Sequence, residues 1–195
     1  LNPNLNTRNV VIIGNGNVAI DVARVLVKTK SEMAESDIPG YAADAIENSP
    51  ITDVYMLGRR GPVQAKFTNV ELREMGELEQ AISLVDPAQL PADVGATDSD
   101  RDRRLKEKNL ATLRGFCSNK SSDSEKRVHF GFWSMPKRIL GSAHAEGVQM
   151  ERTALKDGRV VGTGETFEIK TGLVIPAIGY RSVPMEGLPF DHDND

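Results

Sequence analysis

Residues 9–24 constrain the fold of this chain more than any other stretch of it. Residues 10–13 (VVII) form a short continuous apolar run, which is typical of a strand buried on both faces of a parallel sheet. The run ends on residues 14–19 (GNGNVA), and Val18, Val22, Val25 and Leu26 then recur at helical spacing. We therefore predict a strand, a glycine turn and a helix, the arrangement that opens a dinucleotide-binding unit.

The glycine turn assigns a role to each of its small residues. Gly14 permits the tight turn, Gly16 lets the backbone approach a pyrophosphate, and Ala19 lets the helix pack closely on the strand. Backbone amides near Asn17 would face the anion, with the positive end of the helix dipole behind them. Glycine turns are common, so a strand, turn and helix without a ligand is the alternative.

The second strand ends on a pair of arginines. In the simplest nucleotide-binding unit an acidic residue about 20 positions after the glycines binds the ribose hydroxyl. Acidic residues at that distance lie in residues 31–37, which show no strand pattern, and a helical stretch follows at residues 41–47. The next strand-like run is residues 52–57, and Arg59 and Arg60 follow it. Guanidinium groups bind a 2′-phosphate, which a carboxylate would repel, so we predict NADP as the cofactor. The alternative is a solvated turn.

The segment after the arginines predicts a capped helix. Thr68 and Glu71 fit a capping box, in which each side chain binds the other residue's backbone amide. Capping is a sufficient reason for Glu71. The apolar residues Leu72, Met75, Leu78 and Ile82 then mark one face of the predicted helix.

The remaining two thirds of the chain predict one exposed helix and several strands. Residues 98–116 read as a charged helix whose apolar face is formed by Leu105, Leu110, Leu113 and Phe116. Strand patterns follow at residues 127–140, 148–155, 160–161 and 166–169, with an Asp-Gly turn at residues 157–158, and a last buried strand lies within residues 171–180. We therefore predict an α/β fold, a Rossmann-like doubly wound parallel sheet with an added antiparallel β-meander. His129 and Trp133 are interpreted as structural.

Composition excludes several classes of function. Twenty-four basic and 28 acidic residues give a net charge of −4, which offers no general attraction for nucleic acid. The apolar runs are too short for a membrane span. The single cysteine, Cys117, forms no internal disulfide, and no Cys/His cluster has metal-ligand spacing. We expect a cytoplasmic protein with no metal site, and we find no catalytic constellation.

Several motifs together resemble the adrenodoxin reductase-like ferredoxin-NADP reductases. They are residues 14–24 (GNGNVAIDVAR), 58–62 (GRRGP), 67–76 (FTNVELREMG), 177–181 (AIGYR) and 188–191 (LPFD). In that family the NADP domain is inserted in an FAD domain, whose own glycine fingerprint does not occur in this chain. The resemblance implies that residues 1–180 are the NADP(H)-binding domain and that residues 181–195 are a return linker towards a missing FAD domain.

The resemblance also implies the cofactor contacts. Pyrophosphate contacts fall at Gly16, Asn17 and Val18, the 2′-phosphate lies at Arg59 and Arg60, and Glu71 lies near the adenosine. The full set of candidate cofactor-binding residues is Gly14, Asn15, Gly16, Asn17, Val18, Ala19, Arg59, Arg60 and Glu71. The family supplies no catalytic base, because hydride passes between NADPH and FAD and single electrons pass to a ferredoxin-type iron-sulfur protein.

The implied function is that of the NADP(H)-binding domain of an FAD-dependent ferredoxin/adrenodoxin-NADP(+) reductase. Its partners would be the FAD domain of the same polypeptide and the iron-sulfur protein. Its compartment would be the cytoplasm, or the mitochondrial matrix in a eukaryote. We expect the full-length protein to be an enzyme and this chain alone to be inactive. Two alternatives stay open: the NADPH domain of a glutamate synthase small subunit-like flavoprotein, and a non-enzymatic NADP-sensing module.

Overall fold

Two sheets organise the chain. The computed structural model describes residues 3–120, 126–179, 183–187 and 189–190, so the predicted linker at residues 181–195 lies mostly outside the described residues. The first sheet has five parallel strands in the order β3-β4-β2-β1-β8, and the second has three antiparallel strands in the order β5-β6-β7. The bounds of the strands are β1 (Asn9–Ile13), β2 (Asp53–Leu57), β3 (Ala81–Val85), β4 (Lys126–Gly131), β5 (Ser134–Leu140), β6 (Gly147–Lys156), β7 (Arg159–Lys170) and β8 (Leu173–Pro176).

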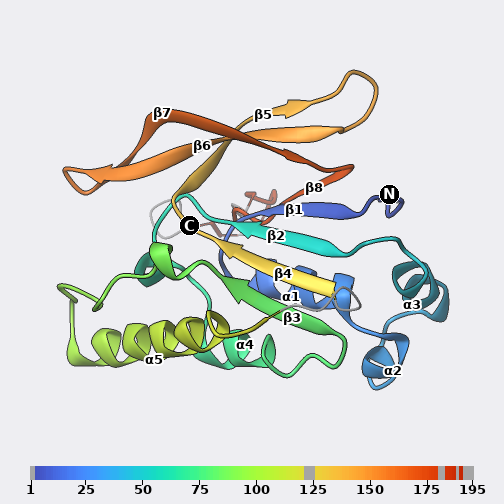
Figure 1. Cartoon of the computed structure of the whole chain (residues 1–195), viewed down its shortest axis with the longest axis horizontal. Helices are drawn as coiled ribbons and strands as arrows, with labels where there is room; N and C mark the ends of the chain where they lie inside the picture. The colour runs from blue at the N-terminus through green and yellow to red at the C-terminus, as the bar shows by residue number, and fades with distance from the viewer. Residues whose placement is uncertain (1–2, 121–125, 180–182, 188, 191–195) are drawn as a thin grey trace.

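Helices and the antiparallel sheet cover opposite faces of the parallel sheet (Figure 1). The helices α1, α4 and α5 lie on one face, and the meander β5–β7 lies on the other. The helices are α1 (Asn17–Val27), α2 (Lys30–Met33), α3 (Gly40–Glu47), α4 (Asn69–Glu74) and α5 (Asp100–Phe116), with 3-10 turns at η1 (Pro62–Gln64) and η2 (Pro87–Gln89). The predicted doubly wound parallel sheet with an added meander is thereby confirmed.

Strand β1 is apolar throughout its middle because both of its faces are covered. Val10 and Ile12 belong to the cluster beneath the helices, whereas Val11 and Ile13 pack against the meander. Successive side chains of a strand point to opposite faces, so a strand between two layers needs apolar residues at every position.

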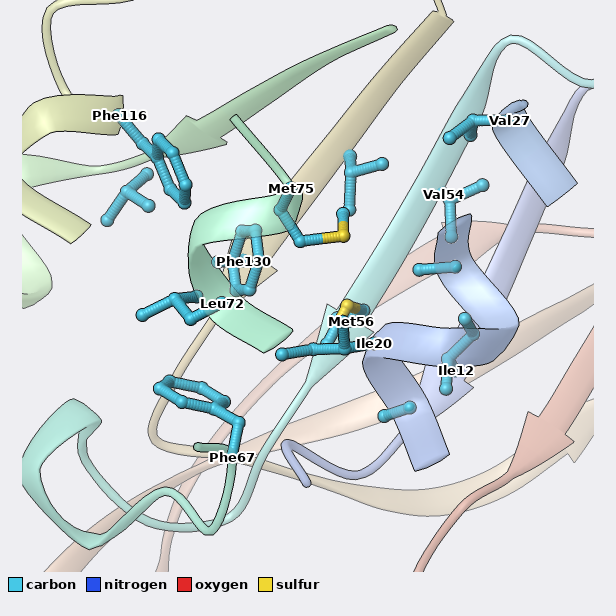
Figure 2. Close-up of a cluster of buried hydrophobic side chains, with 14 of the residues drawn as sticks. Ile12, Ile20, Val27, Val54, Met56, Phe67, Leu72, Met75, Phe116 and Phe130 are labelled. Carbon is cyan, nitrogen blue, oxygen red and sulfur yellow. The ribbon is translucent and has the colours of Figure 1, made fainter. Parts of the chain in front are cut away.

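The core beneath the helices is the larger of the two clusters. Figure 2 shows Phe67, Leu72, Met75 and Phe116 around Phe130, and Ile20 beside Met56. The ring of Phe130 stacks on that of Phe116, with 5.8 Å between ring centroids, and meets Phe67 edge-on at 6.4 Å. Side chains from α1, α4 and α5 therefore fix these helices on β1, β2 and β4.

The carboxyl ends of the central strands lie at one edge. Ile13 of β1 is level with Leu57 of β2 and with Pro176 of β8, and Leu57 is level with Gly131 of β4. The chain leaves β1 towards β2 and returns to β8 on the other side of β1. Ligands of open α/β sheets bind outside the carboxyl ends of the strands at such a switch point.

The predicted helix through residue 82 is wrong. Helix α4 ends at Glu74, and Ile82 lies in β3, which continues the parallel sheet as an edge strand. The spacing of Leu72, Met75, Leu78 and Ile82 fits a helix by coincidence. The Ser83 hydroxyl, which is buried, donates to the Met75 carbonyl and joins the end of α4 to β3.

The apolar face of α1 also differs from the prediction. Val18 is 58% exposed and Val25 is 40% exposed, whereas Ala19, Ile20, Ala23, Leu26 and Val27 are buried. In α5, Leu110, Leu113 and Phe116 are buried as predicted, but Leu105 is 46% exposed. The sequence patterns therefore predicted both helices correctly but assigned some exposed residues to their buried faces.

The last third of the chain forms the sheets differently from the prediction. The single strand predicted at residues 127–140 is two strands, because β4 joins the parallel sheet and β5 joins the meander. Trp133 between them has φ +54°, a left-handed conformation that turns the chain from one sheet to the other. Strand β7 is continuous over Arg159–Lys170, and β8 is a half-buried edge strand, not a buried one.

The part of the chain that the structure describes has neither a membrane-spanning helix nor a cluster of metal ligands. None of the helices in the described ranges is long and apolar enough to span a membrane. The described residues also contain no group of three or more His, Cys, Asp or Glu side chains placed to hold a metal ion.

Candidate nucleotide-binding site

Gly14 sits where the phosphate loop (residues 14–19) crosses the end of β8. Its φ is +140°, which favours glycine, and its amide donates to the Leu57 carbonyl at 2.8 Å. A Cβ on Gly14 would lie 2.8 Å from the carbonyl carbon of Ala177. The first glycine is therefore required by the backbone conformation and by the close approach of β8.

The N-terminus of α1 offers unpaired amides. Gly16 is the N-cap, has extended dihedrals and makes no side-chain cap, and its carbonyl accepts the first helical hydrogen bond from Ile20 at 3.1 Å. The Val18 and Ala19 amides have no acceptor among the described residues, whereas the Asn17 amide faces the Lys66 carbonyl in the parallel bridge between Gly16 and Lys66. No heavy atom lies within 4 Å of the position that a Cβ on Gly16 would take. An anion can therefore approach this end of the helix, where Val18 is 58% exposed, along an open path.

Ala19 fits its predicted packing role. It is fully buried in the core beneath the helices, together with Ile20 and Ala23. A small side chain at this position lets α1 lie close to β1, which aims the helix N-terminus at the carboxyl edge of the sheet.

Arg59 and Arg60 lie on the arginine turn (residues 58–61), which follows β2 directly. Because Ile13 and Leu57 are level, the arginine turn and the phosphate loop start side by side at the same sheet edge. Both arginine side chains are exposed, and no ion pair involves either of them in the part of the chain that the structure describes. The structure thus brings together two unpaired guanidinium groups and a helix N-terminus.

Two asparagines tie the phosphate loop to its surroundings. The side-chain amide of Asn15 donates to the Gly131 carbonyl at 3.0 Å, at the end of β4. The side-chain oxygen of Asn17 accepts from the Thr68 amide at 2.8 Å, and the Asn15 carbonyl accepts from the Lys66 amide at 2.9 Å. These contacts hold the phosphate loop against the end of β4 and against residues 66–68.

The capping box predicted at Thr68 is only half formed. The Thr68 hydroxyl accepts from the Glu71 amide at 3.4 Å, but the Thr68 amide donates to Asn17 and not to Glu71. The Glu71 carboxylate instead lies 3.5 Å from a guanidinium nitrogen of Arg24 on α1. Arg24 also pairs with Glu74, so α1 and α4 are joined beside the phosphate loop. The Glu71 carboxylate therefore lies beside α1, on the side of the candidate site where α1 meets α4.

Lys66 is a residue that the sequence analysis missed. Its backbone pairs with Gly16 in an isolated parallel bridge, and its side chain is exposed. It adds a cation beside the phosphate loop. The only signal in the sequence is its place between the arginines and Thr68, because the bridge depends on a contact between loops distant in sequence.

His129 lies away from this edge, in a cluster on the meander face of the parallel sheet. Its Nε2 is 2.8 Å from a carboxylate oxygen of Asp53, and its ring stacks on Tyr55 with 4.5 Å between ring centroids. Arg127 donates two hydrogen bonds of 2.7 Å to the same carboxylate and holds the pKa of Asp53 far below its usual range. His129 thus has structural partners, as interpreted, which pair β2 with β4.

A cavity of about 400 Å³ lies beside this cluster. It lies between β2, β3 and β4 on one side and β6 and β7 on the other, and its lining includes Tyr55, His129 and Arg152. No residue of the phosphate loop and neither arginine of the turn lines it. The candidate nucleotide site therefore lies outside this cavity.

The comparisons with known proteins cover nearly the whole chain. It is 38% identical over 198 residues to NADPH-ferredoxin reductase FprA of Mycobacterium tuberculosis (strain H37Rv), which includes 98% of this chain and 43% of that protein. It is 39% identical over 206 residues to the mitochondrial NADPH:adrenodoxin oxidoreductase of Arabidopsis thaliana, again with 98% and 43% coverage. No protein-family model matches the chain.

A solved structure agrees with the fold. Mycobacterium tuberculosis FprA in complex with NADPH superposes with a TM-score of 0.87 and 36% identity, over 98% of this chain and 43% of that one. The chain spans less than half the length of these relatives. It is therefore homologous, over nearly its whole length, to one part of the NADPH-ferredoxin and NADPH:adrenodoxin reductases.

Proposed function

We propose that this chain binds NADP(H) at the carboxyl edge of its parallel sheet. The main support for the proposal is that the N-terminus of α1 and two arginines without ion-pair partners lie next to each other, because β1 and β2 end at the same level. The site fits the ligand. Free amides at the helix N-terminus, with open space beside Gly16, suit a pyrophosphate, and the two neighbouring guanidinium groups suit a 2′-phosphate. The related FprA, of the same fold, has been crystallised with NADPH, which supports this choice.

Each candidate residue has a role in this proposal. Gly16, Asn17 and Val18 contact the pyrophosphate, Arg59 and Arg60 bind the 2′-phosphate, and Glu71 lies towards the adenosine. Gly14, Asn15 and Ala19 shape the loop. These contacts hold the adenosine half of the cofactor, and the nicotinamide then extends beyond this domain.

The wider function follows from the relatives. We infer that the chain is the NADP(H)-binding domain of an FAD-dependent ferredoxin/adrenodoxin-NADP(+) reductase, the enzyme class of the proteins named above. When bound, NADPH supplies hydride to a flavin on the remaining part of the polypeptide, and electrons pass on to a ferredoxin-type iron-sulfur protein. We place this reaction in the cytoplasm, or in the mitochondrial matrix of a eukaryote.

Calorimetry with NADP+ and NAD+ tests the cofactor assignment. The chain should bind NADP+ more tightly than NAD+, and Arg59→Ala with Arg60→Ala should reduce that preference at least about tenfold, since charge-assisted hydrogen bonds contribute about 1.5–3 kcal/mol each. Arg159→Ala, at an exposed position of the β6–β7 hairpin, is the matched control and should change nothing. An unchanged preference in the double variant would contradict the assignment.

The two alternatives make different predictions about the gene. A glutamate synthase small subunit-like flavoprotein predicts a cysteine-rich cluster domain in the flanking sequence. An NADP-sensing module predicts a reading frame that ends near residue 195, whereas a reductase needs coding sequence on both sides. The full open reading frame therefore separates the three, and no observation on this chain favours either alternative over the reductase.

A further inference from the structure

The backbone of the arginine turn is bound to the meander side of the molecule. The carbonyls of residues 58, 59 and 60 each accept one hydrogen bond from outside the turn. The donors are, in that order, the Ser134 amide at 3.0 Å, the Thr153 hydroxyl at 2.8 Å and the Trp133 amide at 3.2 Å. No peptide group of this stretch can rotate without breaking a hydrogen bond.

Thr153 connects two of these contacts. It lies in β6 beside a register shift between residues 151 and 153, and it is 6% exposed. Its amide donates to the Trp133 carbonyl at 2.9 Å, while its hydroxyl donates to the Arg59 carbonyl. Together with the bond from the Trp133 amide to Arg60, these bonds join the turn, the β4–β5 connection and β6.

Trp133 holds the other end of the turn. Its φ of +54° is uncommon for a residue other than glycine, and such conformations persist only where the surrounding structure fixes them. Its half-buried indole lies against Gly61, where an added Cβ would be 2.8 Å from the ring atom Cε2. The ring therefore packs directly on the backbone that follows the two arginines.

This arrangement matters for the arginine side chains. The carbonyls of Arg59 and Arg60 are bound to β6 and to the β4–β5 connection, whereas both guanidinium groups are exposed and unpaired among the described residues. Long side chains that must converge on one phosphate lose less freedom on binding if their backbone is already fixed. A mobile turn would leave both cations present and bind the phosphate less tightly.

We propose that Thr153, together with Trp133, positions the arginine turn and thereby sets the preference for NADP(H) over NAD(H). The inference rests on the proposed function, since it assumes that Arg59 and Arg60 bind the 2′-phosphate. It gives the meander a role in cofactor selection, although neither residue need touch the cofactor.

Nucleotide binding to Thr153→Val tests the inference, because valine keeps the shape and removes the hydroxyl donor. The NADP+ affinity measured by calorimetry should fall about three- to tenfold, while the NAD+ affinity stays unchanged. Thr153→Ser restores the donor and should restore the preference. Thr112→Val removes a hydroxyl that donates to the Lys108 carbonyl at 3.1 Å on α5, away from the meander, and serves as the control.

The outcomes separate this inference from the proposed function. A wild-type preference in Thr153→Val, an equal loss for both nucleotides, or no rescue by serine overturns the role of Thr153. In those cases the NADP assignment stands if the double arginine variant has lost its preference. A wild-type chain that binds both nucleotides equally overturns both proposals.

A measurement on the unaltered chain covers the case in which Thr153→Val does not fold. Trp133 is the single tryptophan of the sequence, so its fluorescence reports on the end of the arginine turn. NADP+ should change the emission more than NAD+ does at equal saturation, because only NADP+ carries the 2′-phosphate. Equal responses would overturn the inference.

Discussion

The two glycines of the phosphate loop should respond in opposite ways to the same substitution. Gly14→Ala places a methyl group against the backbone of Ala177 and forces alanine to adopt φ +140°. Gly16→Ala places it in open space, on a backbone with φ −124° that any residue adopts. One glycine is thus required by the fold, and the other leaves space for a ligand.

The structure gives the expected magnitudes. For Gly14→Ala, a strained backbone costs about 1–3 kcal/mol and a forced steric overlap about 1–3 kcal/mol, so the free energy of unfolding should fall by about 2–6 kcal/mol. That is a large part of the 5–15 kcal/mol that stabilises a typical domain, and it would lower the Tm by about 4–24 °C. Gly16→Ala should cost below about 1 kcal/mol, since alanine is a poorer N-cap than glycine.

Two assays together test this reasoning. Urea denaturation followed by circular dichroism gives the free energy of unfolding, and calorimetry gives the affinity for NADP+. Gly16→Ala should keep near-normal stability and lose at least about tenfold in affinity, because its methyl group fills the path to the free amides. A Gly14→Ala variant as stable as the wild type would refute the steric argument. A Gly16→Ala variant with normal affinity would refute the position assigned to the pyrophosphate.

Three further predictions concern stability and activity. Hydrogen bonds from Arg127 lower the pKa of Asp53, so the Asp53 carboxylate stabilises the fold above the usual carboxyl pKa, and this stabilisation is lost as the pH falls below about 4. The free energy of unfolding of Asp53→Asn, measured by urea titration at several pH values, should therefore depend less on pH on the acid side. Leu113→Ala should cost about 2–5 kcal/mol in thermal unfolding, because Leu113 is fully buried, whereas Leu105→Ala on the same helix should be nearly neutral. The chain alone should bind NADP(H) weakly and lack diaphorase activity; reduction of ferricyanide by NADPH without added flavoprotein would contradict this.

The local elements of the candidate site could be predicted from the sequence. A four-residue apolar run, a glycine pattern and a helical repeat are all contained within residues 9–24, and each arises from contacts close in the chain. The same holds for β2 and the two arginines after it. Parallel pairing then brings these elements together, and Gly14 and the arginine turn meet because β1 and β2 end at the same level.

The errors concern features that depend on contacts distant in sequence. Strand β3 was not predicted, because Leu78 and Ile82 continue the helical spacing of α4. Ile82 belongs to a strand only because it pairs with β4. Residues 127–140 divide into two strands because Trp133 adopts a left-handed conformation. Such a conformation is usually predicted from a glycine, and this position holds a tryptophan. The partners of Asn17 and of Glu71 come from a loop and a helix that only the fold brings near.

The glycines on either side of the two arginines have an explanation that the motif alone does not give. Neither Gly58 nor Gly61 is among the described residues with positive φ, so the turn does not need their backbone freedom. Each needs space: a Cβ on Gly58 would lie 2.9 Å from Cγ of Asn15, and one on Gly61 would lie 2.8 Å from the indole of Trp133. Asn15 passes over Gly58 to reach Gly131, and Trp133 packs on Gly61. The order Gly-Arg-Arg-Gly therefore places the phosphate loop against one end of the turn and the indole of the β4–β5 connection against the other, with the two cations exposed between them.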